Sequence, residues 1–137
     1  MTGRFVDMVD PNADAYVVRG INPGAPGDVW RWTGPRPELR FFLESVANVD
    51  FVADFAIADD TFKDTGPVVV SILINGNLLD KVKCDKPGER HFSKAVPPAL
   101  LYPNAPNFAA LEPDKVWVAP TDKVKLGLLL IRAGFKP

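Results

Sequence analysis

Proline and glycine recur along this chain at intervals too short for long helices. The 137 residues include 14 prolines and 10 glycines, which are spread along the sequence rather than repeated. Proline lacks the amide hydrogen that a helix interior needs, and both residue types favour turns. The distribution therefore predicts many short elements joined by turns, in a chain whose length fits one domain.

Several intervals between these turns alternate as half-buried β-strands do. In the segment 51–57 the apolar residues Phe51, Ala53, Phe55 and Ile57 fall on one face. We expect similar strands at 16–19, 38–44, 68–74, 78–84, 89–96, 116–118 and 126–132, and helical turns only near 98–101 and 107–111. No strand–helix alternation is present, so the sequence predicts an all-β, antiparallel β-sandwich, jelly-roll-like, with eight or nine short strands. Residues 1–15 are predicted to be an N-terminal arm, and residues 16–137 to be the single domain.

The clearest local signal is a hairpin at Asn75-Gly76. This pair favours a two-residue type I′ turn, which needs a positive φ at both central positions. Such a turn pairs Ile74 with Asn77 and Leu73 with Leu78. Continued without interruption, this register mixes apolar and polar residues on both faces, which indicates a bulge along the second strand.

The charge pattern excludes some partners. The net charge is −1, and the 16 basic and 17 acidic residues are intermixed. We expect no nucleic-acid role, because no basic stripe is available to neutralise phosphates. No apolar stretch is long enough to span a bilayer, and the given chain opens without the apolar region of a signal peptide, so we expect no membrane role. These features do not indicate the cellular compartment of the protein.

The sequence contains few residues that could form a catalytic site or a metal site. His91 is the single histidine, and no Gly-x-Ser-x-Gly turn surrounds any serine, so we expect no enzymatic activity. Cys84 is the single cysteine, and one histidine with one cysteine predicts no transition-metal site and no cofactor. Asp59, Asp60 and Asp64 lie in a predicted loop and are weak calcium candidates, with a solvated turn as the alternative.

Tryptophans supply the positive indication of a ligand. Trp30 and Trp32 lie two residues apart and share a face in a strand, with Arg31 on the opposite face. Exposed indoles stack on the C–H faces of sugars, while neighbouring polar groups bind the hydroxyls. Trp30, Arg31 and Trp32 are therefore the candidate ligand-binding residues. The alternatives are that both tryptophans belong to the core, or that one is buried and one exposed.

The order of several short motifs resembles a jelly-roll module similar to galactose-binding-like and carbohydrate-binding-module-like domains of bacterial glycan-related proteins. The motifs are Trp30-Arg31-Trp32-Thr33, Val69 to Gly76, Lys86-Pro87-Gly88, Val96-Pro97 and Asp122 before Leu126-Gly127-Leu128. The resemblance covers roughly residues 16–133. It implies a non-catalytic module, often appended to an enzyme that acts on sugars.

We therefore predict a non-catalytic binding module with a carbohydrate-type ligand. A protein partner or a fused enzyme domain is also compatible with this prediction. The alternative is a structural or protein-interaction sandwich without a small ligand. A small enzyme centred on His91 is the third hypothesis.

Overall fold

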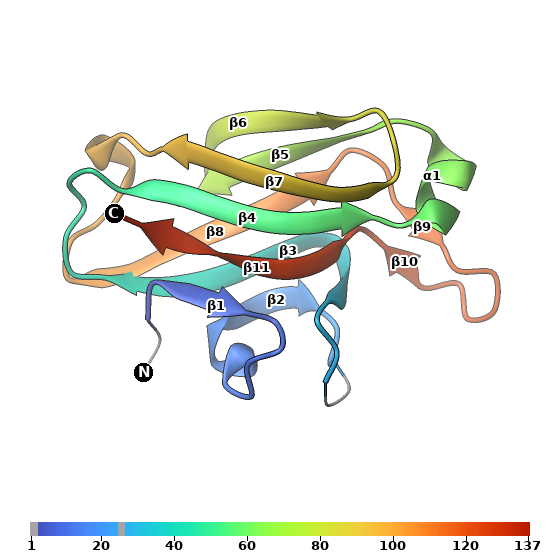
Figure 1. Ribbon diagram of the computed structural model, residues 1–137, viewed down its shortest axis with the longest axis horizontal. Helices are drawn as coiled ribbons and strands as arrows, with labels where there is room; N and C mark the ends of the chain where they lie inside the picture. Colours follow the sequence, from blue (N-terminus) through green and yellow to red (C-terminus); the bar gives the residue numbers. More distant parts are fainter. Residues whose placement is uncertain (1–2, 25–26) are drawn as a thin grey trace.

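Nine strands form one nearly closed antiparallel sheet that folds into two layers in the computed structural model, which describes residues 3–24 and 27–137 (Figure 1). Two further strands form a small separate sheet. The strands are β1 (Phe5–Asp7), β2 (Val17–Ile21), β3 (Arg31–Leu43), β4 (Asp50–Ile57), β5 (Val68–Ile74), β6 (Asn77–Cys84), β7 (Gly88–Ala95), β8 (Ala105–Pro113), β9 (Trp117–Val118), β10 (Lys125–Leu126) and β11 (Leu129–Lys136). One α-helix, α1 (Asp59–Thr65), and two 3-10 turns, η1 (Ala13–Tyr16) and η2 (Pro98–Leu100), complete the described elements.

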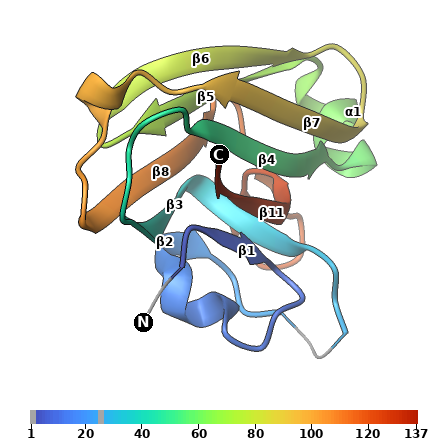
Figure 2. The ribbon, with the colours of Figure 1, turned by 60° about the vertical axis from the view of Figure 1, so that its left-hand side comes forward.

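The two layers share the long strand β3. Its first residues pair with β11, whereas residues 38–43 pair with β8. One layer therefore holds β1, β11, β4 and β7, and the other holds β2, β3, β8, β5 and β6 (Figure 2). The outermost strands, β6 and β7, are joined by an ion pair of 3.1 Å between Lys94 Nζ and Asp80 Oδ2. The predicted jelly-roll-like β-sandwich is confirmed, with more strands than expected.

Aromatic and aliphatic side chains from both layers fill the space between them. Phe41 of β3 and Phe135 of β11 meet edge to face at 5.6 Å between ring centroids. Phe51 of β4 lies 5.2 Å from Phe135. Phe51, Ala53, Phe55 and Ile57 are all buried, as the alternation predicts. Burying side chains of this size is the main source of the domain's stability.

The hairpin forms with the turn that the sequence predicts. Asn75 and Gly76 have φ values of 50° and 83°. Ile74 pairs with Asn77 and Leu73 with Leu78, after which the register shifts so that Ile72 pairs with Asp80. The predicted bulge is therefore present, and Leu79 is the extra residue.

Asn75 also ties the hairpin to the loop before β8. Its Nδ2 donates to the Leu100 carbonyl at 2.8 Å and to Asn107 Oδ1 at 2.9 Å, and its Oδ1 accepts from the Phe108 amide at 2.8 Å. Asn107, which is fully buried, also accepts from the Tyr102 amide at 2.8 Å and donates to the Tyr102 and Ala105 carbonyls. We call Asn75 and Asn107 with these partners the amide network.

One expected helical turn is wrong. Residues 107–111 belong to β8, a central strand, whereas the turn expected near 98–101 is confirmed as η2. Proline obscures the strand in the sequence, because it cannot donate a ladder hydrogen bond. Pro106 and Pro113 are tolerated because each lies in a part of β8 that has a neighbouring strand on one side only. Pro106 pairs with β3, in a part of β8 that β5 does not reach. Pro113 pairs with β5, in a part of β8 that β3 does not reach.

The predicted N-terminal arm is part of the sandwich over its described residues. β1 pairs with β11, and Val6, Met8 and Ala13 are buried in the core. Three strand residues are too few for a legible alternation, so the sequence does not reveal this strand. Met1 and Thr2 lie outside the described residues. Within the described part of the chain, no helix has the length and apolarity required to cross a membrane.

Candidate functional site

The strand register places two of the three predicted ligand-binding residues, Arg31 and Trp32, on opposite faces. Arg31 pairs with the buried Leu130, and its side chain is 10% exposed and forms an ion pair of 2.5 Å with Asp14. Trp32 pairs with Leu129 and so takes the opposite face. Trp30 precedes β3 and is half exposed. The structure therefore places Trp32 on the outer face, next to β11 of the layer formed by β1, β11, β4 and β7, and Arg31 on the opposite face.

Paired residues share a face of a sheet, so the register also shows which residues accompany Trp32. Leu129 of β11 pairs with Ala56 of β4, and Ala56 pairs with Glu89 of β7. These four residues, Trp32, Leu129, Ala56 and Glu89, form the apolar row, which crosses the strands and ends on one carboxylate. Leu129 and Ala56 are only partly buried. Their outer surface is thus open on the sheet face.

A second indole stands beside the apolar row. The Trp117 ring of β9 lies 6.0 Å from the Trp32 ring between centroids, with 36° between the planes. Both rings are partly exposed, and the small sheet of β9 and β10 holds Trp117 in place through the pairing of Leu126 with Trp117. Trp117 lies between Val116 and Val118, and this alternation by itself predicts a position in the core or at a sheet edge. Its partnership with Trp32 depends on a contact between residues 85 positions apart, which alternation within one strand cannot reveal.

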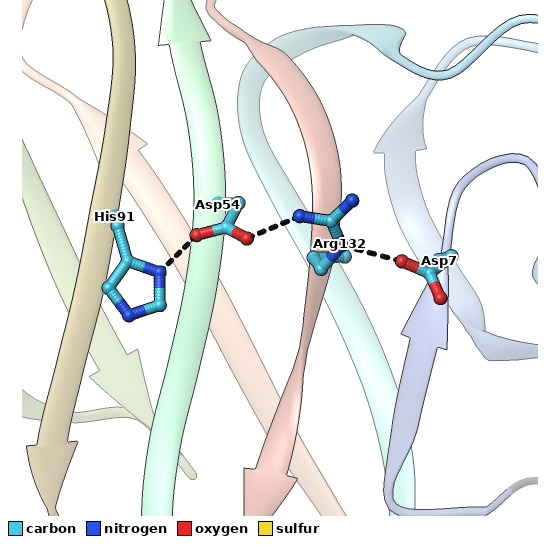
Figure 3. A network of polar contacts seen from close by, with 4 residues as sticks. All are labelled: Asp7, Asp54, His91 and Arg132. Atoms are coloured by element: carbon cyan, nitrogen blue, oxygen red, sulfur yellow. Dashed lines mark hydrogen bonds and ion pairs between the residues drawn. The ribbon is translucent and has the colours of Figure 1, made fainter.

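A row of ionisable residues lies on the same face, two or three residues along the strands from the apolar row. Figure 3 shows its four side chains. Four adjacent strands contribute one side chain each. Arg132 donates from Nε to Asp7 Oδ1 and from Nη1 to Asp54 Oδ2, both at 2.6 Å. His91 Nδ1 is hydrogen-bonded to the other Asp54 oxygen. We call Asp7, Arg132, Asp54 and His91 the polar row.

A bulge in β11 allows the two rows to share a face. The register shifts between Leu130 and Arg132, so that Leu130 pairs with Phe55 and Arg132 pairs with Asp54. Without the extra residue, Ile131, the Arg132 side chain would point into the core. The bulge therefore places a cation on the outer surface beside two carboxylates.

Electrostatics in the polar row favour the ionised forms of Asp54 and Arg132. Burial acts to raise the pKa of Asp54, whose side chain is 17% exposed, but the hydrogen bonds from Arg132 and His91 outweigh it and hold the pKa below its usual value. The carboxylates of Asp7 and Asp54 in turn raise the pKa of Arg132. Asp54 is thus a fixed anion at neutral pH, and the side chains of Asp7, Arg132 and His91 are 45%, 43% and 65% exposed.

The weak calcium candidates do not lie in the loop that the sequence predicts. Asp59, Asp60 and Asp64 belong to α1, where Asp59 and Asp60 occupy the first turn and suit the positive end of the helix dipole. All three are exposed. Within residues 3–24 and 27–137, no group of three or more acidic, histidine or cysteine residues is arranged to hold a metal ion.

Local sequence patterns indicate only part of this face. They predict Trp32 as a ligand-binding residue, and they suggest His91 only as a catalytic base. Asp54 is the one charged residue in the otherwise apolar segment 51–57. It is the only feature of the local sequence that points to the polar row. Asp7 and Arg132 join it through strand pairing across 125 residues, so no local pattern identifies them.

The fold recurs in a protein of known structure. An acetyl xylan esterase from the rumen bacterium Butyrivibrio proteoclasticus matches with a TM-score of 0.53 and 14% identity. The match covers 99% of this chain and 32% of the esterase, so the chain spans about a third of that protein's length. At this identity the likeness shows the fold alone.

Two other solved structures are similar at lower TM-scores. A family 35 carbohydrate-binding module from Clostridium thermocellum has a TM-score of 0.44 and 11% identity over 83% of this chain and 82% of the module. An exo-β-1,3-galactanase from Phanerochaete chrysosporium has a TM-score of 0.49 and 10% identity over 99% of this chain and 29% of the enzyme. No family model matches the sequence, and no curated protein matches it. The predicted resemblance is confirmed at the level of the fold.

Proposed function

We propose that this chain is a non-catalytic carbohydrate-binding module that binds its ligand on the outer face of the layer formed by β1, β11, β4 and β7. The observation that carries the proposal is the Trp32–Trp117 pair beside the polar row. Indole rings offer stacking surfaces for the C–H faces of sugar rings, and the polar row offers charged hydrogen-bonding groups for hydroxyls. Such a site needs both features on one surface.

The surroundings of His91 support a binding role over a catalytic one. Its Nδ1 is hydrogen-bonded to Asp54, and a hydrolytic triad requires a nucleophile on its other nitrogen. Among the described residues, no serine or cysteine side chain is hydrogen-bonded to His91, and Cys84 is fully buried. A carbohydrate ligand is also consistent with the esterase of the same fold, whose name refers to an acetylated glycan.

Affinity electrophoresis in gels containing birchwood xylan, konjac glucomannan or curdlan tests the proposal. We expect the parent to be retarded by at least one of these polysaccharides. Trp32→Ala and Trp117→Ala should each weaken that retardation about tenfold, because each removes half of the stacking surface. Trp30→Ala is the matched control and should bind as the parent does.

Unchanged retardation of both Trp32→Ala and Trp117→Ala would move the site away from this face, and equal loss in all three tryptophan variants would contradict the assignment of binding to the Trp32–Trp117 pair. A parent that is not retarded by any of the three polysaccharides, and that instead elutes with a protein partner, would favour the structural or interaction module. Hydrolysis of a glycan or of its ester groups by the parent, abolished in His91→Ala, would contradict the non-catalytic assignment.

A further inference from the structure

We propose that the ligand is an internal stretch of an extended, uncharged glycan chain that lies across the strands, along the apolar row. This inference rests on the proposed function, and it assigns both the orientation and the chemical class of the ligand. A module that binds a chain end or a single sugar would have a different site, in which side chains surround one ring.

The spacing of the contacts supports a chain. Neighbouring strands lie about 4.8 Å apart, so the four side chains of the polar row extend over three such steps, about 14 Å. One step is close to the length of a pyranose unit in an extended chain. Each sugar along the row would therefore meet the side chains of one strand.

The two rows match the two kinds of surface on such a chain. Sugar rings present apolar C–H faces, and their hydroxyls project from the edges. Trp32, Leu129 and Ala56 offer a continuous apolar floor, whereas Arg132, Asp54 and His91 lie two or three residues along the same strands, about 7 Å to one side. Rings that lie on the floor would thus direct one hydroxyl edge towards the polar row.

The charge of the face indicates an uncharged chain. Asp7, Asp54 and Glu89 are carboxylates, and Arg132 is the cation that joins the first two. His91 adds a positive charge only when it is protonated. An acidic chain such as a polyuronate would meet more negative than positive charge, whereas neutral hydroxyls can donate to the carboxylates and accept from Arg132.

Isothermal titration with oligosaccharides of one to six units tests this inference. The probes are the xylose, mannose and β-1,3-glucose series, with hexagalacturonate as the acidic chain. We expect the association constant in at least one neutral series to rise about tenfold from the disaccharide to the tetrasaccharide and then to level off. Hexagalacturonate should not bind.

Variants at the far end of the rows locate the chain. Glu89→Ala and His91→Ala on β7 should weaken tetrasaccharide binding and leave disaccharide binding unchanged, because a disaccharide on the Trp32 end does not reach β7. Lys83→Ala on β6, in the other layer, is the control and should alter neither.

The outcomes distinguish the two proposals. A monosaccharide that binds as tightly as the hexasaccharide would overturn the extended-chain inference and leave the binding function standing. Binding of hexagalacturonate in preference to the neutral series would overturn the uncharged class. If none of the polysaccharides or oligosaccharides binds, both proposals are wrong.

Discussion

Two polar networks in this molecule differ in charge and in burial. The amide network joins Asn75 at the hairpin turn to Asn107, which is fully buried. The polar row joins Asp7, Arg132, Asp54 and His91 on the outer face of the sandwich, where three of the four side chains are at least 43% exposed. Neutral amides thus form the buried network, whereas the surface network includes the ionised Asp54 and Arg132.

The difference follows from the cost of desolvation. A buried amide is tolerated when all of its donors and acceptors are bonded, whereas a buried charge costs far more free energy. Both the Oδ1 and the Nδ2 of Asn107 are hydrogen-bonded within the protein. The exposed members of the polar row retain access to solvent and to a ligand. We infer that the amide network serves stability and that the polar row serves binding.

Removing the buried amide should have the largest effect on stability. Asn107→Ala leaves the Tyr102 amide and Asn75 Nδ2 with fewer acceptors in a buried site, which should lower the free energy of unfolding by about 2–4 kcal/mol. Urea denaturation measures this change. Asn77→Ala, at an exposed position, is the control and should remain close to the parent. A variant as stable as the parent would contradict the structural role of the amide network.

The turn that presents Asn75 should show the next largest effect. Gly76 has a φ of 83°, and a Cβ added there would meet no atom within 4 Å, so the strain of Gly76→Val comes from the backbone alone. We expect a loss of about 1–2 kcal/mol, because a β-branched residue resists this conformation. Asn77→Val, one residue further along and in β6, should cause little loss in the same thermal unfolding measurement. If Gly76→Val melts at the parent temperature, the type I′ turn is wrong.

Substitution in the polar row should have the smallest effect on stability, and that effect should depend on pH. The pKa of Asp54 lies below its usual value in the folded protein, so its contribution to stability is present above the unfolded-state pKa, about 3.9, and is lost as the pH falls through the folded-state value. Asp54→Asn should therefore be less stable than the parent at pH 7, with a difference that shrinks below about pH 4.

Denaturant titrations of the parent and of Asp54→Asn at several pH values measure that difference, with Asp64→Asn, at an exposed position in the last turn of α1, as the control. A gap that stays constant down to pH 2 would show that the carboxylate charge contributes nothing. A loss at pH 7 larger than that of Asn107→Ala would reverse the assignment of the two networks.

The sequence by itself determined the features that depend on neighbouring residues. Alternation at Phe51, Ala53, Phe55 and Ile57 identified a half-buried strand, and Asn75-Gly76 identified the turn, because strand periodicity and backbone φ preferences act within a few residues. The mixed faces of the hairpin even indicated its bulge. The distribution of proline and glycine indicated the all-β class for the same local reason.

Tertiary structure decided which residues meet. It paired Arg31 with Asp14, brought Trp117 to Trp32, and made Asp59, Asp60 and Asp64 part of a helix rather than of a loop. It also joined Asp7 to Arg132, through a short strand at one end of the chain and a bulged strand at the other. Strand order and register depend on long-range packing of both layers, so no local preference encodes them, and the candidate binding face is a product of that packing.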